Sequence, residues 1–143
     1  MIEIRPCQEG DARALFDDLH PITRQEGEAY KVFGAALYPH IRDTSERAGA
    51  RTGVIDGRVA FIAASGVLRL EERTRRTSFV MAQCDGRKLA IAARKWAKME
   101  RADYPGWSFS VTSYSLHPLR DRFFAALGLR YKGGRPGFAL FVG

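Results

Sequence analysis

Short runs of alternating hydrophobic and polar residues recur along the chain, and each predicts a strand. Near the start, Ile2 and Ile4 alternate with charged residues before Pro6. Residues 52–64 hold two such runs joined by Asp56-Gly57, a strong signal for a two-residue hairpin turn. The other strand-like runs cover residues 75–82, 107–113, 129–133 and 137–142, whereas residues 66–75 are expected to form an irregular connection.

Two helices are expected in the first third of the chain. Asp11 is placed to cap the first, which Pro21 ends. Thr23, followed by a glutamate three residues later, has the spacing of a capping box that opens the second helix. Apolar residues then recur at helical intervals to about Pro39, and residues 42–50 are polar and irregular. The apolar face of the first helix is expected to be Leu15, Phe16 and Leu19.

Residues 87–103 carry the clearest helical pattern in the chain. A last helix is expected from Pro118 to about Gly128, a residue suited to the left-handed position after a helix. The apolar stripe of residues 87–103 consists of Leu89, Ala92, Ala93, Trp96 and Met99, which we expect to be buried. A basic face on the opposite side consists of Arg87, Arg94, Lys98 and Arg101.

The order of these elements is β-α-α-β-β-β-α-β-α-β-β. Strands and helices that alternate in this way predict an α/β (α+β) fold with a central mixed sheet and about four flanking helices. The 143 residues suit one domain, and neither a linker nor an internal repeat divides them, so a single domain over residues 1–143 is expected.

Composition narrows the class of protein. With 45% hydrophobic and 27% charged residues, the chain has the balance of a folded globular protein. No apolar run reaches the ~18 residues of a membrane span, and the N-terminus lacks the layout of a signal peptide. Cys7 and Cys84 have no metal-site spacing, so two reduced thiols and no metal are expected.

The net charge of +7 favours acidic partners. Nucleic acid is one such partner, but that hypothesis rests on net charge alone, because the chain has no dense block of like charge. The charge is equally consistent with a role in solubility only.

Residues 83–88 (QCDGRK), between a predicted strand and a predicted helix, are the first candidate site. The order of elements, together with this segment, resembles the GCN5-related N-acetyltransferase (GNAT) fold. In that family the acyl-CoA loop has the pattern Gln/Arg-x-x-Gly-x-Gly/Ala, and here Gln83 and Gly86 match its first two fixed positions. Backbone N–H groups at such a turn face a pyrophosphate, and small residues allow close approach.

The 83–88 loop also departs from the family pattern. Lys88 stands where the family has Gly or Ala and would crowd the phosphates, and Asp85 adds a negative charge. The expectation is therefore no tightly bound cofactor, with acetyl-CoA as the cofactor if the protein is active. In that case the resemblance assigns CoA binding to Met81, Gln83, Gly86, Arg87 and Lys88.

A second stretch, RFFAALGLRY (residues 122–131), resembles the helix-to-strand signature of the same family. Family members that do chemistry usually place a tyrosine, as general acid, where this chain has Phe124. The resemblance therefore leaves enzyme activity open. The candidates to act instead, only if the protein is active, are Tyr114 and His117, which follow a predicted strand.

From about residue 76 onward the chain also resembles the small GNAT-like internal virion proteins of T7-like phages. That resemblance implies a phage-encoded virion or assembly component, located in the virion or host cytoplasm, with acetyltransferase chemistry lost or residual. It would bind other virion proteins through the basic face. The alternative is an acetyl-CoA-dependent N-acetyltransferase with an atypical loop.

Overall fold

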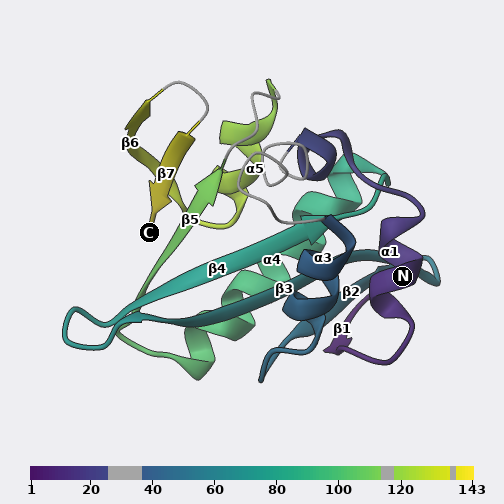
Figure 1. The fold of residues 1–143 in the computed structure, drawn as a ribbon, viewed down its shortest axis with the longest axis horizontal. Helices are drawn as coiled ribbons and strands as arrows, with labels where there is room; N and C mark the ends of the chain where they lie inside the picture. Colours follow the sequence, from purple (N-terminus) through teal and green to yellow (C-terminus); the bar gives the residue numbers. More distant parts are fainter. Residues whose placement is uncertain (26–36, 114–117, 136–137) are drawn as a thin grey trace.

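The computed structural model describes residues 1–25, 37–113, 118–135 and 138–143, and within them seven strands form one mixed sheet (Figure 1). The strands are β1 (Ile2–Pro6), β2 (Arg51–Ile55), β3 (Arg58–Arg69), β4 (Thr74–Met81), β5 (Ser108–Ser113), β6 (Arg130–Arg135) and β7 (Phe138–Val142). The helices with defined bounds are α1 (Asp11–Phe16), α3 (Leu37–Ser45), α4 (Gly86–Asp103) and α5 (Arg120–Ala126). The predicted order of elements and the mixed sheet are confirmed.

The sheet has the strand order β1-β2-β3-β4-β5-β7-β6. Strands β1 to β4 form an antiparallel meander, and β5, β7 and β6 form a second antiparallel group. One parallel pair, β4 with β5, joins the two groups, and it extends only over Thr74–Ser108, Arg75–Phe109 and Arg76–Ser110. The two groups are therefore held together by a short ladder.

Helices cover both faces of the sheet (Figure 1), and each face has its own core. Because β3 is central, the six residues from Ala60 to Ser65 are all buried, as is typical of a strand covered on both faces. The core under α1 and α3 contains Ala12, Leu15, Ile41, Ile62, Val80 and Ala82. The larger core on the α4 and α5 face includes Phe61, Met81, Leu89, Trp96, Phe109, Phe124 and Phe141.

The predicted hairpin between β2 and β3 is confirmed. Asp56 and Gly57 have φ angles of 51° and 79°, the left-handed conformation that a tight primed turn requires. A second glycine in β2, Gly53, serves packing instead, because a Cβ placed there would overlap the Phe61 ring. The aromatic ring fits against β2 only because this residue has no side chain.

Three local predictions were wrong. Asp11 does not cap α1: the N-cap is Gly10, and the buried Asp11 carboxylate accepts hydrogen bonds from Arg5 and Thr52 instead. Pro39 does not end a helix but lies within α3, which continues to Ser45, into the segment that was expected to be irregular. Residues 66–75 are a hairpin in which β3 continues to Arg69, with a register shift near its end.

The region around Thr23 also differs from the prediction. Residues 21–25 are helical, so Pro21 starts a helical turn rather than ending one. Thr23 is buried, and its hydroxyl accepts a hydrogen bond from the backbone of Met81 rather than capping a helix. The predicted apolar face of this helix, apart from Leu37, lies outside the described residues.

Helix α4 is confirmed, and its packing differs in two places. Leu89, Ala92, Ala93 and Trp96 are buried as predicted, but Met99 is 37% exposed. On the basic face, Arg87, Arg94 and Lys98 are exposed, whereas Arg101 turns toward the sheet and places its guanidinium 5.4 Å from the Phe109 ring centre. The helix is rotated so that Glu100, rather than Met99, faces the core.

Glu100 joins a buried polar network that fastens α4 to the sheet. Its carboxylate accepts hydrogen bonds from Arg51 of β2 at 2.9 Å and from Ser65 of β3 at 2.5 Å. Arg75 of β4 donates to Ser65 at 2.9 Å and stacks 3.5 Å over the Tyr104 ring. Because every buried charge here has a partner, the network is a stable anchor at the end of the sheet where β4 and β5 are paired.

Candidate functional site

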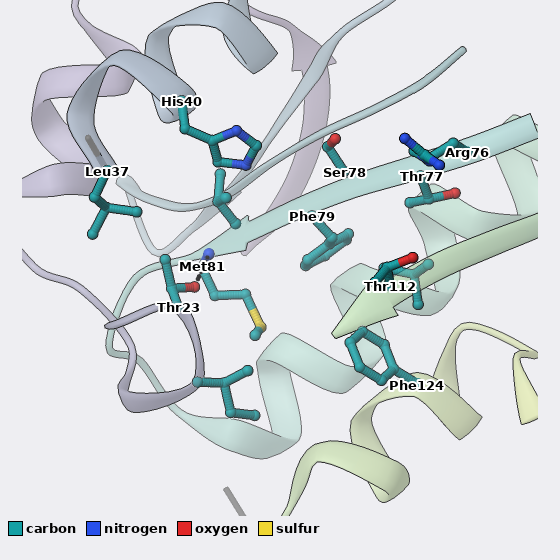
Figure 2. A pocket seen from close by; sticks show the side chains of 13 residues that line it. Thr23, Leu37, His40, Arg76, Thr77, Ser78, Phe79, Met81, Thr112 and Phe124 are labelled. Atoms are coloured by element: carbon teal, nitrogen blue, oxygen red, sulfur yellow. Dashed lines mark hydrogen bonds between the residues drawn. The ribbon is translucent and has the colours of Figure 1, made fainter. Parts of the chain in front are cut away.

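Beyond Arg76 and Ser110 the two parallel strands separate, and a cavity of about 290 Å³ opens between them (Figure 2). Residues of β4 form one wall, β5 and α5 the other, and α3 closes one side. The residues that line the cavity are Ile22, Thr23, Leu37, His40, Arg76, Thr77, Ser78, Phe79, Val80, Met81, Val111, Thr112 and Phe124. The cavity is a direct result of the short β4–β5 ladder.

The separation leaves one backbone edge of β4 facing the cavity. The N–H of Ala82 donates to Ala60 O at 2.8 Å. The backbone N–H and C=O groups of even-numbered residues here are therefore directed toward β3, and those of odd-numbered residues toward β5. Consistent with this alternation, the N–H of Met81 donates to the Thr23 hydroxyl at 2.8 Å, and its carbonyl accepts from His20 N at 2.9 Å. The N–H of Phe79, which has the same parity, is therefore directed into the cavity.

His40 extends from α3 over one side of β4, the side that also carries Arg76 and Ser78 (Figure 2). The imidazole is half-buried. Burial lowers its pKa below the ordinary value of 6.5, and the positive charge of Arg47 acts in the same direction, against the opposing effect of Asp43. At neutral pH the ring is therefore uncharged, which is the form that accepts a proton.

The other side of the cavity is mainly apolar. Phe79 and Met81 point to this side of β4, near Phe124 of α5 (Figure 2). The Phe124 side chain is 4% exposed and has no proton to give. The position that the family signature assigns to a general acid therefore does line the cavity, but it carries an aromatic ring only.

The 83–88 loop leads from β4 into α4, and its own carboxylate caps the helix. Asp85 accepts hydrogen bonds from the backbone N–H groups of Arg87 at 2.9 Å and Lys88 at 3.2 Å. An incoming phosphate would need these N–H groups, because they are the free donors of a helix N-terminus. The Asp85 carboxylate therefore already occupies the position where a bound phosphate would lie.

Lys88 is also engaged, but it does not crowd the loop. Its ammonium lies 2.6 Å from a carboxylate oxygen of Asp56 in the β2–β3 turn. Gly86 begins α4 without a left-handed φ, and a Cβ built on it would meet no described protein atom within 4 Å. A diphosphate bound at the N–H groups of Arg87 and Lys88 would have to displace the Asp85 carboxylate.

The structure brings together some of the residues predicted for CoA binding. Met81 lines the cavity, while Gln83, Gly86, Arg87 and Lys88 are exposed at the adjoining loop. The backbone N–H of Gln83 donates to Asp18 O at 2.7 Å. Tyr114 and His117, the residues predicted for catalysis, lie outside the described residues.

Sequence reasoning missed His40, Phe79 and Thr23 as residues of the cavity, as well as Arg76. His40 follows Pro39, where the second helix was expected to end, and was not considered as a site residue. One signal was available: residues 75–78 are polar, although they form the first half of a predicted strand whose second half, residues 79–82, is apolar. A central strand that carries such a polar half is a candidate for a site.

Two further features bear on the kind of site. Within residues 1–25, 37–113, 118–135 and 138–143, His, Cys, Asp and Glu side chains form no group of three able to hold a metal ion. In the same part of the chain, no helix has both the length and the apolar character needed to cross a bilayer.

Comparison with known proteins identifies the fold. No protein-family model matches the chain, and no curated protein matches its sequence. Solved structures do match. The GNAT domain of S. lividans PAT has a TM-score of 0.74 at 11% identity, over 99% of this chain and 89% of that one.

Two other structures illustrate the range of the likeness. An acetyltransferase from Thermus thermophilus has a TM-score of 0.64 at 19% identity, over 100% of this chain and 96% of that one. The microcin C7 self-immunity acetyltransferase MccE, in complex with acetyl-CoA and AMP, has a TM-score of 0.63 at 11% identity, over 99% and 91% of the two chains. None of these three is a virion protein. The strand order, the separated parallel pair and these likenesses together show that the chain has the GNAT fold of acetyltransferases.

Proposed function

We propose that the protein is an acetyl-CoA-dependent N-acetyltransferase that acts on a small amine. The observation that carries this proposal is the cavity where β4 and β5 separate, because it brings a backbone N–H of β4 and an uncharged imidazole to one space. The likeness to acetyltransferases, one of them with acetyl-CoA bound, supports it. Fold likeness alone does not establish an activity, so the residues of the cavity carry the argument.

The chemistry requires that an amine lose a proton before it attacks the acyl carbon. His40 accepts that proton at a ring nitrogen, since its lowered pKa keeps the imidazole neutral at physiological pH. The Phe79 N–H donates toward the carbonyl oxygen, where negative charge develops. When bound, acetyl-CoA supplies the acetyl group, with its C–S bond breaking as the C–N bond forms. The second proton shed by the nitrogen reaches the CoA thiolate through solvent, because Phe124 has none to give.

The 83–88 loop sets the expected affinity for the donor. The Asp85 carboxylate competes for the N–H groups of Arg87 and Lys88, and Asp56 holds the Lys88 ammonium. A diphosphate must displace the first carboxylate and faces the second at short range. We therefore expect acetyl-CoA to bind weakly, with a dissociation constant in the tens to hundreds of micromolar.

The same capped loop favours a second candidate function. A GNAT-fold protein that no longer acetylates would retain the fold with its donor site closed, as the resemblance to internal virion proteins implies. In that role the exposed Arg87, Arg94 and Lys98 of α4 would bind an acidic partner. The structures compared above are acetyltransferases and lend this role no support, so we place it second.

Calorimetric titration with acetyl-CoA, run beside an assay for free CoA thiol with a panel of primary amines, separates the two functions. Weak saturable binding with amine-dependent thiol release is expected. A His40→Gln variant should keep the binding and lose most of the release. Absence of both binding and release at millimolar acetyl-CoA would leave the non-enzymatic role as the better account.

A further inference from the structure

The side of the cavity between α3 and β4 carries two arginines. Arg76 lines the cavity itself. The Arg47 guanidinium, just beyond α3, donates a 3.0 Å hydrogen bond to the hydroxyl of Ser78, which also lines it. Because Arg76 and Ser78 are two residues apart on β4, their side chains leave the same face of the strand, the face over which His40 lies (Figure 2).

Several arginines on the sheet are paired with carboxylates. Arg5, Arg51 and Arg58 each pair with a carboxylate, at 2.8, 2.9 and 3.2 Å. Within the part of the chain that the structure describes, no ion pair forms at Arg47 or Arg76. None of the described residues that line the cavity carries a carboxylate. Among the described residues, the two guanidinium groups on this side of the cavity are therefore not paired with a carboxylate, although the Asp43 carboxylate also acts on His40.

The positive charge acts on the cavity. Arg47 is one of the groups that lower the pKa of His40, so its charge is within electrostatic reach of the imidazole. An anion bound between Arg47 and Arg76 would thus lie beside His40. Guanidinium groups suit this task, because their planar donors match the two oxygens of a carboxylate or the oxygens of a phosphate.

We propose that the acetyl acceptor is a small primary amine that also carries an anionic group, either a carboxylate or a phosphate, and that Arg47 and Arg76 bind that group. The inference rests on the proposed function, because the amine is taken to be the acetyl acceptor. With its anion on the two arginines, the acceptor directs its nitrogen toward His40 and the gap at Phe79. The volume of about 290 Å³ lies at the lower end for ligand pockets and suits a small molecule.

Matched pairs of acceptors test the proposal. Free α-amino acids are compared with their carboxamides, and phosphoethanolamine with ethanolamine, by the rate of CoA thiol release. We expect kcat/KM to be about 10- to 100-fold higher for the anionic member of the preferred pair, the range of a charge-assisted contact. The two arms distinguish a carboxylate from a phosphate. Equal kcat/KM within both pairs would overturn the proposal.

Variants locate the effect. Arg76→Gln and Arg47→Gln should each raise KM for the anionic amine about 10-fold, with a smaller change in kcat. Arg76→Lys should restore part of the loss. Arg94→Gln, which removes the same charge from the exposed face of α4, is the control and should change KM for neither the anionic nor the neutral amine. If Arg94→Gln raised KM as much as Arg76→Gln, net charge rather than a site would explain the preference.

Calorimetry without acetyl-CoA separates this inference from the proposed function. The probes are the same amino acids and inorganic phosphate. Binding that Arg76→Gln abolishes, without acetylation of any amine, would support the anion site and remove the acetyltransferase function. Acetylation of neutral and anionic amines at equal rates would support the acetyltransferase function and exclude the anion site. If neither binding nor acetylation were observed, both the anion site and the acetyltransferase function would be excluded.

Discussion

The Lys88 ammonium lies 2.6 Å from one carboxylate oxygen of Asp56, and the N-terminal amine lies 2.6 Å from the other. Hydrogen bonds from Lys88 and from the N-terminus lower the pKa of Asp56 to about 2. The first turn of α4 is thereby tied to the β2–β3 hairpin. The positive charge of Lys88, beside the 83–88 loop, is therefore paired with Asp56 within the protein.

Asp56→Asn should therefore strengthen acetyl-CoA binding. The change releases Lys88 and removes a negative charge near the loop, while asparagine tolerates the left-handed turn position that Asp56 occupies (φ 51°). We expect the dissociation constant from calorimetry to fall several-fold at low salt and less at high salt. Asp56→Asn combined with Lys88→Gln is the control, and a gain that persists there would mean that Lys88 is not the group released.

The cap on α4 leads to a second prediction. Asp85→Asn keeps a capping oxygen but removes the charge, whereas Asp85→Ala removes both. Both variants should bind acetyl-CoA more tightly than the parent. Only Asp85→Ala should lose stability, by about 0.5–2 kcal/mol in denaturant unfolding. Unchanged affinity in both variants would show that the carboxylate does not compete with the donor.

Gly53 and Gly66 form a matched pair for stability. A Cβ at Gly53 would overlap the Phe61 ring, whereas a Cβ at Gly66 would meet nothing within 4 Å. Gly53→Ala should therefore destabilise the protein by about 1–3 kcal/mol, because a fully buried ring must move. Gly66→Ala should be neutral or slightly stabilising. Equal melting temperatures for the two variants would mean that β2 and β3 do not approach as closely as described.

His40 makes two pH-dependent predictions. Its pKa is lower in the fold than its ordinary value of 6.5, so kcat/KM should fall on the acid side only below pH 6.5. His40→Gln should lower kcat/KM by about 10²–10⁴-fold and remove that acid limb. An acid limb that persists unchanged in His40→Gln would exclude His40 as the base.

The free energy of unfolding should also depend on the protonation of His40. Above pH 6.5 the imidazole is neutral in both folded and unfolded chains and contributes nothing. As the pH falls below 6.5, the unfolded chain takes up the proton first, so the free energy of unfolding decreases until the pH reaches the folded pKa. His40→Gln should lack this part of the pH dependence in denaturant melts, and an identical pH dependence in the variant would contradict the lowered pKa.

Much of the fold was predictable because local pattern and tertiary packing agree. The alternation around Phe79, the stripe through Trp96 and the turn at Asp56-Gly57 each specify one element. The failures occurred where a side chain serves a distant partner. Asp11 looked like a cap but binds Arg5 and Thr52, which no local rule contains.

The candidate site was harder to predict, because it arises from a gap between strands rather than from a motif. Nothing in the sequence states that the described residues of β4 and β5 pair at three positions only, and so nothing placed His40 beside the gap between these strands. The 83–88 loop was found from its glycine, and its departure from the family pattern was visible. The way that Asp85 and Lys88 are each engaged required the fold, since Asp56 is 32 residues from Lys88.

The short ladder between β4 and β5 also makes the cavity an adjustable one. At its closed end, buried hydrogen bonds among Arg75, Ser65 and Glu100 hold β4 to β3 and α4. Beyond Arg76 no ladder joins the described residues of β4 to those of β5, so no backbone hydrogen bond between these parts of the two strands opposes a wider gap. In native-state hydrogen exchange the amide of Phe79 should exchange much faster than that of Val80, although the two are adjacent. The protein would then admit acceptors of different widths by changing the angle between its two sheet halves, at almost no cost in backbone hydrogen bonds.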